Sequence, residues 1–294
     1  MSESADVLVV GSGISGLLVA RELLAAGREV TIVERGPLRL DADKLPLEER
    51  EAALPTTAHN TEAPPGEHIH GWQYGYAYGG SSLLWAGVAP RLLPSDFELH
   101  TRHGVGRDWP ISYDDLIPFY QEAERALRVC GRPDPAFPGT DAYLEPPRPS
   151  DADLLVGPLL EPFGTLPIAR ELAAPGQYPP PLEGDASAVE RSVTILGVAR
   201  EVADSPGLRV VDRSAAARLR TAAGQVEAVE CVGADGDKFE LRANQVVLAT
   251  HGIENPALLL RSGLDGPAVG RWLGDHTHVI LDVELAEPHR HWDA

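Results

Sequence analysis

The N-terminal part of the chain carries the clearest hydrophobic pattern. A short valine-rich apolar run at residues 5–10 leads into a helical pattern in which Leu17, Ala20 and Leu23 share one face. A second apolar run follows at residues 29–33. The pattern predicts a strand, a helix and a second strand in direct succession.

The periodicity fades after these elements. Residues 36–73 and 131–185 are rich in proline and glycine, and we expect loop or lid insertions there, with a short helix at Leu47–Leu54. Between the two insertions, Ser112 and Asp115 stand at capping-box spacing and predict a helix that Gly131 ends.

Strand patterns return in the last third of the chain, with glycines between them. They lie at residues 208–211, 226–232, 238–241 and 245–250. After the last strand, Asn255 as N-cap and Pro256 at the first helical position predict a helix that closes at Gly263. We find no internal repeat.

The first predicted strand-to-helix turn contains the glycine motif G-x-G-x-x-G. Gly11 permits the tight turn, Gly13 lets a pyrophosphate approach the backbone, and Gly16 lets the helix pack closely on the strand. Gly27 closes the helix, and the second strand ends at Glu34, where a carboxylate can accept hydrogen bonds from ribose hydroxyls. An acid there disfavours a 2′-phosphate. The whole unit predicts a dinucleotide-binding site.

Composition narrows the function classes. The chain has 294 residues and a formal net charge of −19, which argues against binding nucleic acid or an anionic membrane surface. The sequence shows neither a transmembrane run nor a signal-peptide pattern, so we expect a cytoplasmic protein. Cys130 and Cys231 lie far apart, which predicts two reduced thiols and no metal site.

A second glycine-rich stretch, residues 74–87, mixes small residues, hydroxyls and aromatics without a helical or strand period. Taken by itself it is an ordinary loop. Together with Trp109–Asp114, Val246–Pro256 and Gly270–His276, and with the N-terminal unit, it resembles the glucose–methanol–choline (GMC) family of flavin oxidoreductases. The resemblance is nearest to the bacterial pyranose and C-glycoside oxidase and sugar dehydrogenase branch.

The resemblance implies an α/β fold, a Rossmann-like FAD-binding domain over residues 1–294. A substrate domain would be largely absent from this chain, with residues 277–294 as its beginning or as a tail. The implied activity is FAD-dependent oxidation of a CH–OH group of a sugar, glycoside or other alcohol, by hydride transfer to flavin N5.

By the same resemblance, FAD is the cofactor. Leu84 stands where some relatives carry a linking histidine, so we expect non-covalent FAD. The resemblance assigns cofactor contacts to Gly11, Gly13, Ile14, Ser15, Gly16, Glu34, Arg35, Gly79, Gly80, Ser81, Ser82, Trp85, Ala86, Gly87, Ala216, Ala249 and Thr250.

No catalytic base is assigned. Relatives carry a catalytic histidine in a C-terminal segment that returns to the flavin, whereas His289 and His291 do not stand in that context. We therefore expect a second protein chain, or a missing segment, to complete the substrate domain and bring the histidine. If a single chain were active, the candidate bases would be His68, His70, His251 and His276.

Two other readings stay open at this point. One is a non-catalytic FAD-binding scaffold or interaction subunit. The other is an NAD-linked dehydrogenase, which fits the N-terminal unit but leaves residues 79–87 and 246–256 without a role. A flavin spectrum would separate the last reading from the others.

Overall fold

The computed structural model describes residues 5–45, 49, 56–59, 72–146, 151–160, 166–169, 193–271 and 273. Contacts between residues divide the chain into two compact units. Unit 1 takes its described residues from Met1–Trp85 and Thr194–Asp275, and unit 2 takes its own from Ala86–Val193. Residues 277–294 lie outside the described part, and the predicted domain boundaries stay predictions.

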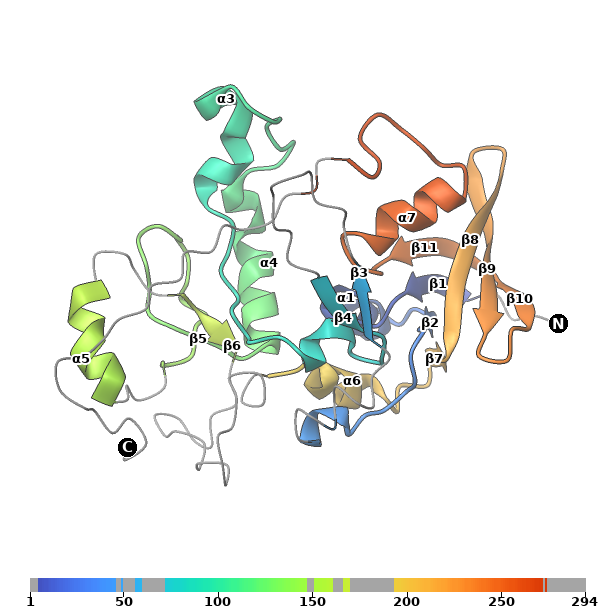
Figure 1. The fold of residues 1–294 in the computed structure, drawn as a ribbon, viewed down its shortest axis with the longest axis horizontal. Helices are drawn as coiled ribbons and strands as arrows, with labels where there is room; N and C mark the ends of the chain where they lie inside the picture. The colour runs from blue at the N-terminus through green and yellow to red at the C-terminus, as the bar shows by residue number, and fades with distance from the viewer. Residues whose placement is uncertain are drawn as a thin grey trace. The chain divides into compact units, whose positions relative to one another are not determined.

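Unit 1 is built on a parallel sheet in the strand order β11-β1-β2-β7 (Figure 1). The strands are β1 (Ala5–Val10), β2 (Val30–Val33), β7 (Leu208–Val211) and β11 (Ala243–Leu248). Val9 pairs with Val247 on one side and with Ile32 on the other, and Ile32 pairs with Val210. The hydrophobic pattern predicted each of these strands, and the structure confirms them.

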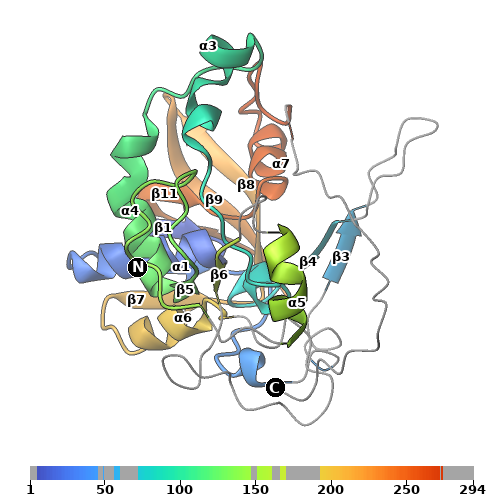
Figure 2. The ribbon, with the colours of Figure 1, turned by 90° about the vertical axis from the view of Figure 1, so that its left-hand side faces the viewer.

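An antiparallel sheet in the order β10-β9-β8 packs on one face of the parallel sheet, next to α7 (Figures 1 and 2). Its strands are β8 (Ser214–Ala222), β9 (Gln225–Gly233) and β10 (Lys238–Leu241), and the helix is α7 (Glu254–Arg261). The shared core contains Leu8, Val10, Val33, Leu219, Val229, Cys231, Leu241 and Leu258. Because strand residues alternate in direction, Val7 and Val9 face the opposite side.

Helices cover that opposite side. α1 (Ile14–Ala25) contacts β1 and β2, and α6 (Leu196–Val202) packs against α1. Unit 1 therefore has three layers: an antiparallel sheet, a parallel sheet and a pair of helices.

The predicted cap of α7 is wrong. The helix begins at Glu254 with Ile253 as its N-cap, so Asn255 and Pro256 lie inside the first turn. The Asn255 side chain instead accepts hydrogen bonds from the amide and hydroxyl of Thr250, at 2.9 and 2.6 Å. Pro256 is tolerated because first-turn amides have no intrahelical acceptor. Gly263 follows the helix end with a φ of 73°, as predicted.

Part of the predicted insertion at residues 36–73 is structured. It contains η1 (Ala42–Lys44) and a hairpin of β3 (Thr56–His59) with β4 (Trp72–Gly75), whereas the sequence predicted a loop. Only residue 49 of the predicted helix Leu47–Leu54 lies within the described residues. A 3₁₀ turn, η2 (Gly80–Leu83), follows β4.

Unit 2 contains short elements around one longer helix. They are η3 (Pro94–Glu98), α3 (Leu99–His103), α4 (Tyr113–Ala126), β5 (Val129–Cys130), α5 (Asp151–Leu160) and β6 (Ile168–Ala169). The capping box of α4 is confirmed: Ser112 Oγ accepts from the amide of Asp115, and Asp115 Oδ2 accepts from the amide of Ser112. The helix ends before the predicted Gly131, because Arg128 adopts a φ of 53° and the next residues form β5.

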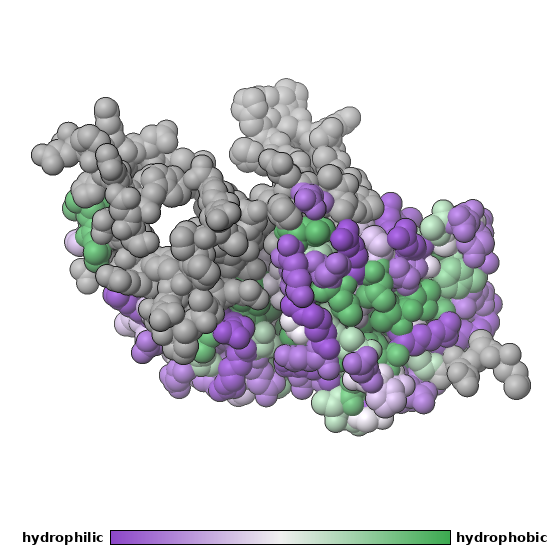
Figure 3. All heavy atoms as spheres, turned by 90° about the horizontal axis from the view of Figure 1, so that it is seen from below, coloured by the Kyte–Doolittle hydropathy of each residue, from purple (hydrophilic) through white to green (hydrophobic). Residues whose placement is uncertain are grey.

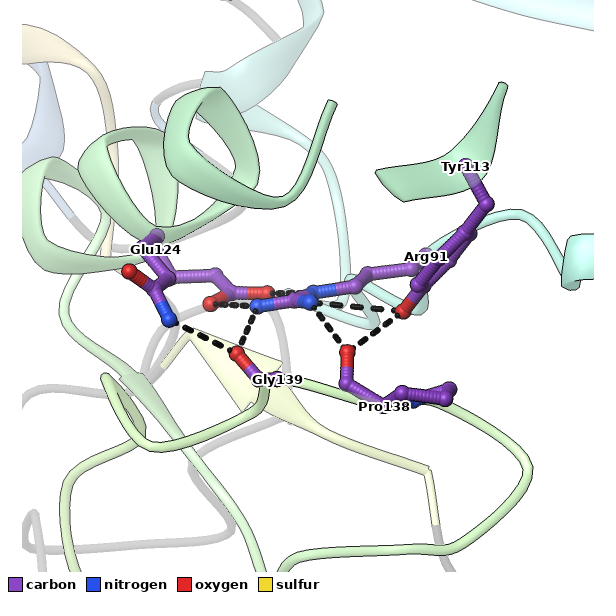
Figure 4. A network of polar contacts seen from close by, with 6 residues as sticks. Arg91, Tyr113, Glu124, Pro138 and Gly139 are labelled. Atoms are coloured by element: carbon purple, nitrogen blue, oxygen red, sulfur yellow. Dashed lines mark hydrogen bonds and ion pairs between the residues drawn. The ribbon is translucent and has the colours of Figure 1, made fainter. Parts of the chain in front are cut away.

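A buried ion pair fixes unit 2 internally (Figure 4). The Arg91 and Glu124 side chains are 1% and 6% exposed and form a bidentate pair. The Arg91 guanidinium also donates to the carbonyl oxygens of Pro138 and Gly139, each at 2.9 Å. Tyr113 Oη donates to Pro138 at 2.9 Å. The network ties the segment before η3, helix α4 and the loop at 138–139 together.

Helix α5 exposes apolar side chains. Leu154, Leu155 and Leu159 are 60%, 40% and 72% exposed, and this helix gives the hydrophobic patch at the left edge of Figure 3. Among the described residues, no helix has both the length and the apolar character needed to span a membrane.

Candidate dinucleotide site

A cavity of about 610 Å³ opens in unit 1 at the carboxyl ends of β1, β2 and β11. Ligands of open parallel sheets bind at this edge, because the loops that follow the strands meet there. The walls come from the β1–α1 turn, the end of β2, the segment from β4 to η2, the start of β8 and the β11–α7 turn. The volume is in the usual range for small-molecule sites, roughly 300–1,000 Å³.

The three glycines of the first turn have three different surroundings. A Cβ built on Gly11, which has a φ of 96°, would lie 2.6 Å from the carbonyl oxygen of Ala249. A Cβ on Gly16 would lie 2.0 Å from the carbonyl oxygen of Gly11. A Cβ on Gly13 would meet nothing within 4 Å. Gly11 and Gly16 thus serve the packing of the fold, whereas Gly13 faces open space.

Helix α1 starts at the cavity. Gly13 is its N-cap, and Ile14 and Ser15 are its first residues. The amides of a first turn lack intrahelical acceptors and lie at the positive end of the helix dipole. This end of the cavity therefore suits an anionic group such as a diphosphate.

Glu34 lies at the end of β2 and is 6% exposed. Its Oε2 accepts from the amide of Ser12 at 3.0 Å and from the Ser12 hydroxyl at 2.6 Å, and its Oε1 accepts from the amide of Gly36 at 2.8 Å. Burial raises the pKa of Glu34, and these donors oppose the rise. The carboxylate is held rigidly at the cavity wall.

The second glycine-rich segment touches the first. Gly79 and Gly80 have φ values of 104° and 57°, and the amide of Gly79 donates to the carbonyl oxygen of Ser12 at 3.1 Å. A Cβ built on Gly80 would lie 3.1 Å from the Cα of Gly13. Residues separated by more than sixty positions are therefore packed backbone to backbone beside the cavity.

An arginine and a tyrosine stack at the same wall. The guanidinium carbon of Arg35 lies 4.1 Å from the centroid of the Tyr76 ring, and both residues line the cavity. The stack offers a flat surface with a cationic group attached to it.

Most of the predicted cofactor-contacting residues meet at this cavity. Those that line it are Gly11, Gly13, Ile14, Ser15, Glu34, Arg35, Gly80, Ser81, Ser82, Trp85, Ala216, Ala249 and Thr250. Gly16 and Gly79 are packed behind the wall, against Gly11 and Leu196 respectively. Ala86 and Gly87 belong to unit 2.

Sequence reasoning named His251, which also lines the cavity, only as a candidate base. It missed other lining residues, which include Ser12, Tyr76, Ser214, Ala215, Ala217, Glu254, Leu258 and Arg261. Ser12 and Tyr76 lie within motifs that the sequence did reveal. The β8 residues had no signal, because a run of serine and alanine lacks the β-branched residues that mark strands. Glu254 and Arg261 are brought in by α7, whose start was predicted two residues too late.

The cavity fits a dinucleotide. It combines open space beside Gly13, the amide-rich start of α1, a fixed carboxylate at Glu34 and a wall of small residues at the start of β8. These are the features that a diphosphate, a ribose and a flat ring system require.

Comparisons with known proteins give the class of this fold. Residues 6–44 match the family model described as FAD dependent oxidoreductase, and residues 187–278 match the model described as GMC oxidoreductase. In structure, the chain is similar to pyridoxine 4-oxidase from Mesorbium loti, with a TM-score of 0.60 and 24% identity over 89% of this chain and 52% of that one. The class is that of FAD-binding oxidoreductase folds.

Two sequence relatives are oxidoreductases as well. The chain is 26% identical to the fructose dehydrogenase large subunit of Gluconobacter japonicus, over 97% of this chain and 61% of the relative. It is 30% identical to the 6'''-hydroxyparomomycin C oxidase of Streptomyces lividus, over 96% of this chain and 55% of the relative. The chain is therefore similar to GMC oxidoreductases in sequence and in fold, and FAD is its cofactor. It spans little more than half the length of these relatives.

Proposed function

We propose that this chain is the flavin-binding part of an oxidoreductase that acts on CH–OH groups of a sugar, glycoside or other alcohol. The observation that carries the proposal is the cavity itself, where the open Gly13 turn, the fixed Glu34 carboxylate and the second glycine segment converge. The names of the sequence relatives, which include fructose, pyridoxine and 6'''-hydroxyparomomycin C, support a polar alcohol as the substrate class.

The residues of this chain would bind and orient the cofactor. The start of α1 and Gly13 would hold the diphosphate, and Glu34 would accept from the adenosine ribose. Gly80, Ser81 and Trp85 would lie along the ribityl chain and the ring. The bound flavin supplies the hydride acceptor, N5, for the hydrogen that leaves the alcohol carbon.

The hydroxyl proton of the substrate needs a base, for which histidine is suited near neutral pH. Among the described residues that line the cavity, the imidazole is that of His251, whose Nδ1 accepts from the amide of Ile253 at 3.3 Å. We propose that the catalytic histidine comes from a second chain or from a further segment. His68, His70 and His276 lie outside the described residues.

Two observations support a partner chain. One sequence relative is named as a large subunit, which places that protein in an assembly. In this chain, α5 presents Leu154, Leu155 and Leu159 to solvent, and such apolar surfaces are typical of interaction sites.

The test is anaerobic reduction of the reconstituted flavoprotein. The chain is loaded with FAD, freed of excess, and mixed with fructose, pyridoxine or an aminoglycoside, with and without the protein encoded by the neighbouring reading frame. We expect substrate-dependent bleaching of the flavin when the partner is present. A chain that binds FAD but is not reduced by any alcohol under either condition is the non-catalytic scaffold instead.

The non-covalent attachment of FAD is a separate proposal that rests on Leu84. Acid precipitation is expected to leave the yellow colour in the supernatant, whereas colour in the pellet would show a covalent link through another residue. The cytoplasmic location also stays a prediction, and fractionation of cells that express the native gene would test it.

A further inference from the structure

The hydroxyl of Ser12 lies between the two glycine-rich segments of the cavity, residues 11–16 and 74–87. Ser12 follows Gly11 in the first glycine motif, is 0% exposed, and lines the cavity. Its Oγ is 2.6 Å from Glu34 Oε2 and 3.3 Å from the amide nitrogen of Gly79. Partners that lie 22 and 67 positions away in the sequence therefore meet at one oxygen atom.

The direction of these hydrogen bonds follows from the groups that form them. Glu34 accepts from the amides of Ser12 and Gly36, which is the role of an ionised carboxylate, so the hydroxyl proton of Ser12 is donated to Glu34 as well. The Gly79 amide donates to a lone pair of Ser12 Oγ and, at 3.1 Å, to the Ser12 carbonyl oxygen. The carbonyl oxygen of Ala77 lies 3.5 Å from Ser12 Oγ, which is long for a hydroxyl donor. The bonds from Gly79 to Ser12 and from Ser12 to Glu34 run in one direction, so they strengthen each other.

Ser12 supplies two donors to one oxygen of Glu34. Oε2 accepts from the Ser12 amide at 3.0 Å and from the Ser12 hydroxyl at 2.6 Å, whereas Oε1 accepts from the Gly36 amide at 2.8 Å. A carboxylate has about four acceptor positions in all, so Ser12 fills those of Oε2 and leaves Oε1 for a ligand hydroxyl. Burial raises the pKa of Glu34, and the Ser12 hydroxyl is among the donors that oppose the rise and favour the accepting form.

The other partner of Ser12 begins the second wall of the cavity. Gly79 has a φ of 104° and is the N-cap of η2, and the next residues, 80–82, line the cavity. A Cβ built on Gly80 would lie 3.1 Å from the Cα of Gly13, so the two backbones leave no room for a side chain between them. The Ser12 hydroxyl therefore holds the start of η2 where it approaches the first glycine motif.

We propose that Ser12 is a positioning residue that couples the two walls of the cofactor site: its hydroxyl directs the Glu34 carboxylate to the adenosine ribose and holds the start of η2 against the first glycine motif. This inference rests on the proposed function, because it requires FAD in the cavity. Ser12 acts through Glu34 and Gly79. Its position is an unspecified residue of G-x-G-x-x-G, so the motif alone assigns it no role.

A second buried serine of unit 1 provides a matched control. Ser262 is 7% exposed, and its hydroxyl donates to the carbonyl oxygen of Leu258 at 2.6 Å and accepts from the amide of Leu219 at 2.8 Å. Like the hydroxyl of Ser12, it donates one short bond and accepts one from a backbone amide, but Ser262 is not among the described residues that line the cavity. Ser12→Ala and Ser262→Ala should both lower the melting temperature of the protein without FAD, because each removes a buried hydrogen-bonded hydroxyl.

Calorimetric titration of the full chain, freed of FAD, with ADP and with 2′,3′-dideoxy-ADP tests the effect on Glu34. The second nucleotide lacks both ribose hydroxyls. Wild type is expected to bind ADP about tenfold more tightly, the scale of a hydrogen bond to a charged group. Ser12→Ala should reduce this preference to about threefold, and Ser12→Cys, which keeps a weaker donor of similar shape, should lie between the two. Ser262→Ala should keep the preference of wild type.

A double-variant cycle shows whether Ser12 acts through the carboxylate. Glu34→Ala should abolish the preference for ADP, and Ser12→Ala added to it should change the ratio of the two affinities no further. FAD itself should bind Ser12→Ala about three- to tenfold more weakly than wild type, and Ser262→Ala as tightly as wild type.

Hydrogen exchange followed by mass spectrometry tests the effect on η2. In the protein without ligand, amides of residues 79–83 should exchange faster in Ser12→Ala than in wild type, because the Gly79 amide loses one of its two acceptors. Exchange of this segment should be unchanged in Ser262→Ala, whose hydroxyl bonds to α7 and β8 instead.

An equal preference for ADP in wild type and Ser12→Ala would overturn the inference, and so would equal exchange of residues 79–83 in the two proteins. Changes of the same size in Ser262→Ala would also overturn it, because they would reflect a general loss of stability. If folded wild-type protein failed to bind FAD, the proposed function itself would fall. The two failures are therefore distinguishable.

Discussion

Two buried carboxylates, one in each unit, are satisfied in opposite ways. Glu124 forms a bidentate pair with Arg91 in the interior of unit 2, and Arg91 also donates to two backbone carbonyls and to the Tyr113 hydroxyl. Glu34 in unit 1 accepts from neutral donors, the Ser12 amide and hydroxyl and the Gly36 amide, and it lines a cavity.

The difference in partners indicates a structural role for Glu124 and a ligand-binding role for Glu34. A buried charge with a complete set of charged and polar partners holds chain segments together. Removing either member of the ion pair leaves the other as an uncompensated buried charge. A carboxylate that burial disfavours, kept at the wall of a cavity by neutral dipoles, retains acceptor capacity for a ligand. Variants at the two sites should therefore affect different measurements.

The largest effect is expected in unit 2. Arg91→Met leaves Glu124 buried without its cation, and the free energy of unfolding should fall by about 3–5 kcal/mol in urea denaturation. The double variant Arg91→Met with Glu124→Leu removes both charges and should recover much of the loss. A single variant as stable as wild type would show that the pair contributes nothing to the fold.

The next effect concerns packing at the first turn. Gly16→Ala places a Cβ 2.0 Å from the Gly11 carbonyl oxygen, so the backbone must shift, at a cost of about 1–3 kcal/mol. Gly197→Ala is the matched control, because Gly197 lies in α6 and its Cβ would meet nothing within 4 Å. Thermal melts should show a loss for the first variant alone. Equal melting temperatures of the two variants would mean that the fold does not require the close approach of Gly16 to the Gly11 carbonyl.

At the cavity, Glu34→Ala should weaken FAD binding by about 1.5–3 kcal/mol, the range for hydrogen bonds to a charged group. Glu227→Ala, at an exposed position on β9, is the control and should leave affinity unchanged. Calorimetric titration of both variants measures the difference. An unaltered dissociation constant in Glu34→Ala would remove this residue from the binding site.

The smallest effect is a pH dependence of stability without FAD. Burial raises the pKa of Glu34 above its ordinary value of 4.5, so ionisation is harder in the folded than in the unfolded state. Its contribution to stability is present below that value and declines as the pH rises through the folded-state pKa. Relative to Glu34→Gln, wild type should lose stability as the pH rises from the ordinary value of 4.5 through the raised folded-state pKa. The measured quantity is the difference in free energy of unfolding between wild type and Glu34→Gln. If this difference stayed constant, or if it shifted in favour of wild type as the pH rose, the raised pKa would be contradicted.

The sequence predicted the framework of the cavity because its signals are local. β1, α1 and β2 follow from apolar periodicity, and the roles of Gly11, Gly13 and Gly16 follow from one motif. Each of these features is set within a few residues of chain.

Features that depend on tertiary contacts escaped prediction. Arg91 and Glu124 lie 33 residues apart without a shared motif. β8 forms because β9 pairs along it, although its alanines have little strand propensity. Asparagine is a common N-cap residue, yet the Asn255 side chain accepts a hydrogen bond from Thr250 and donates one to Leu248, at the end of β11.

The most direct test of the central claim is the FAD content of Gly13→Val. A Cβ on Gly13 meets nothing within 4 Å, so the variant should fold with the circular dichroism and melting temperature of wild type. Its branched side chain would occupy the space that the diphosphate requires. The account predicts stoichiometric flavin in reconstituted wild type and a folded, colourless variant. A folded Gly13→Val protein with stoichiometric FAD would contradict it.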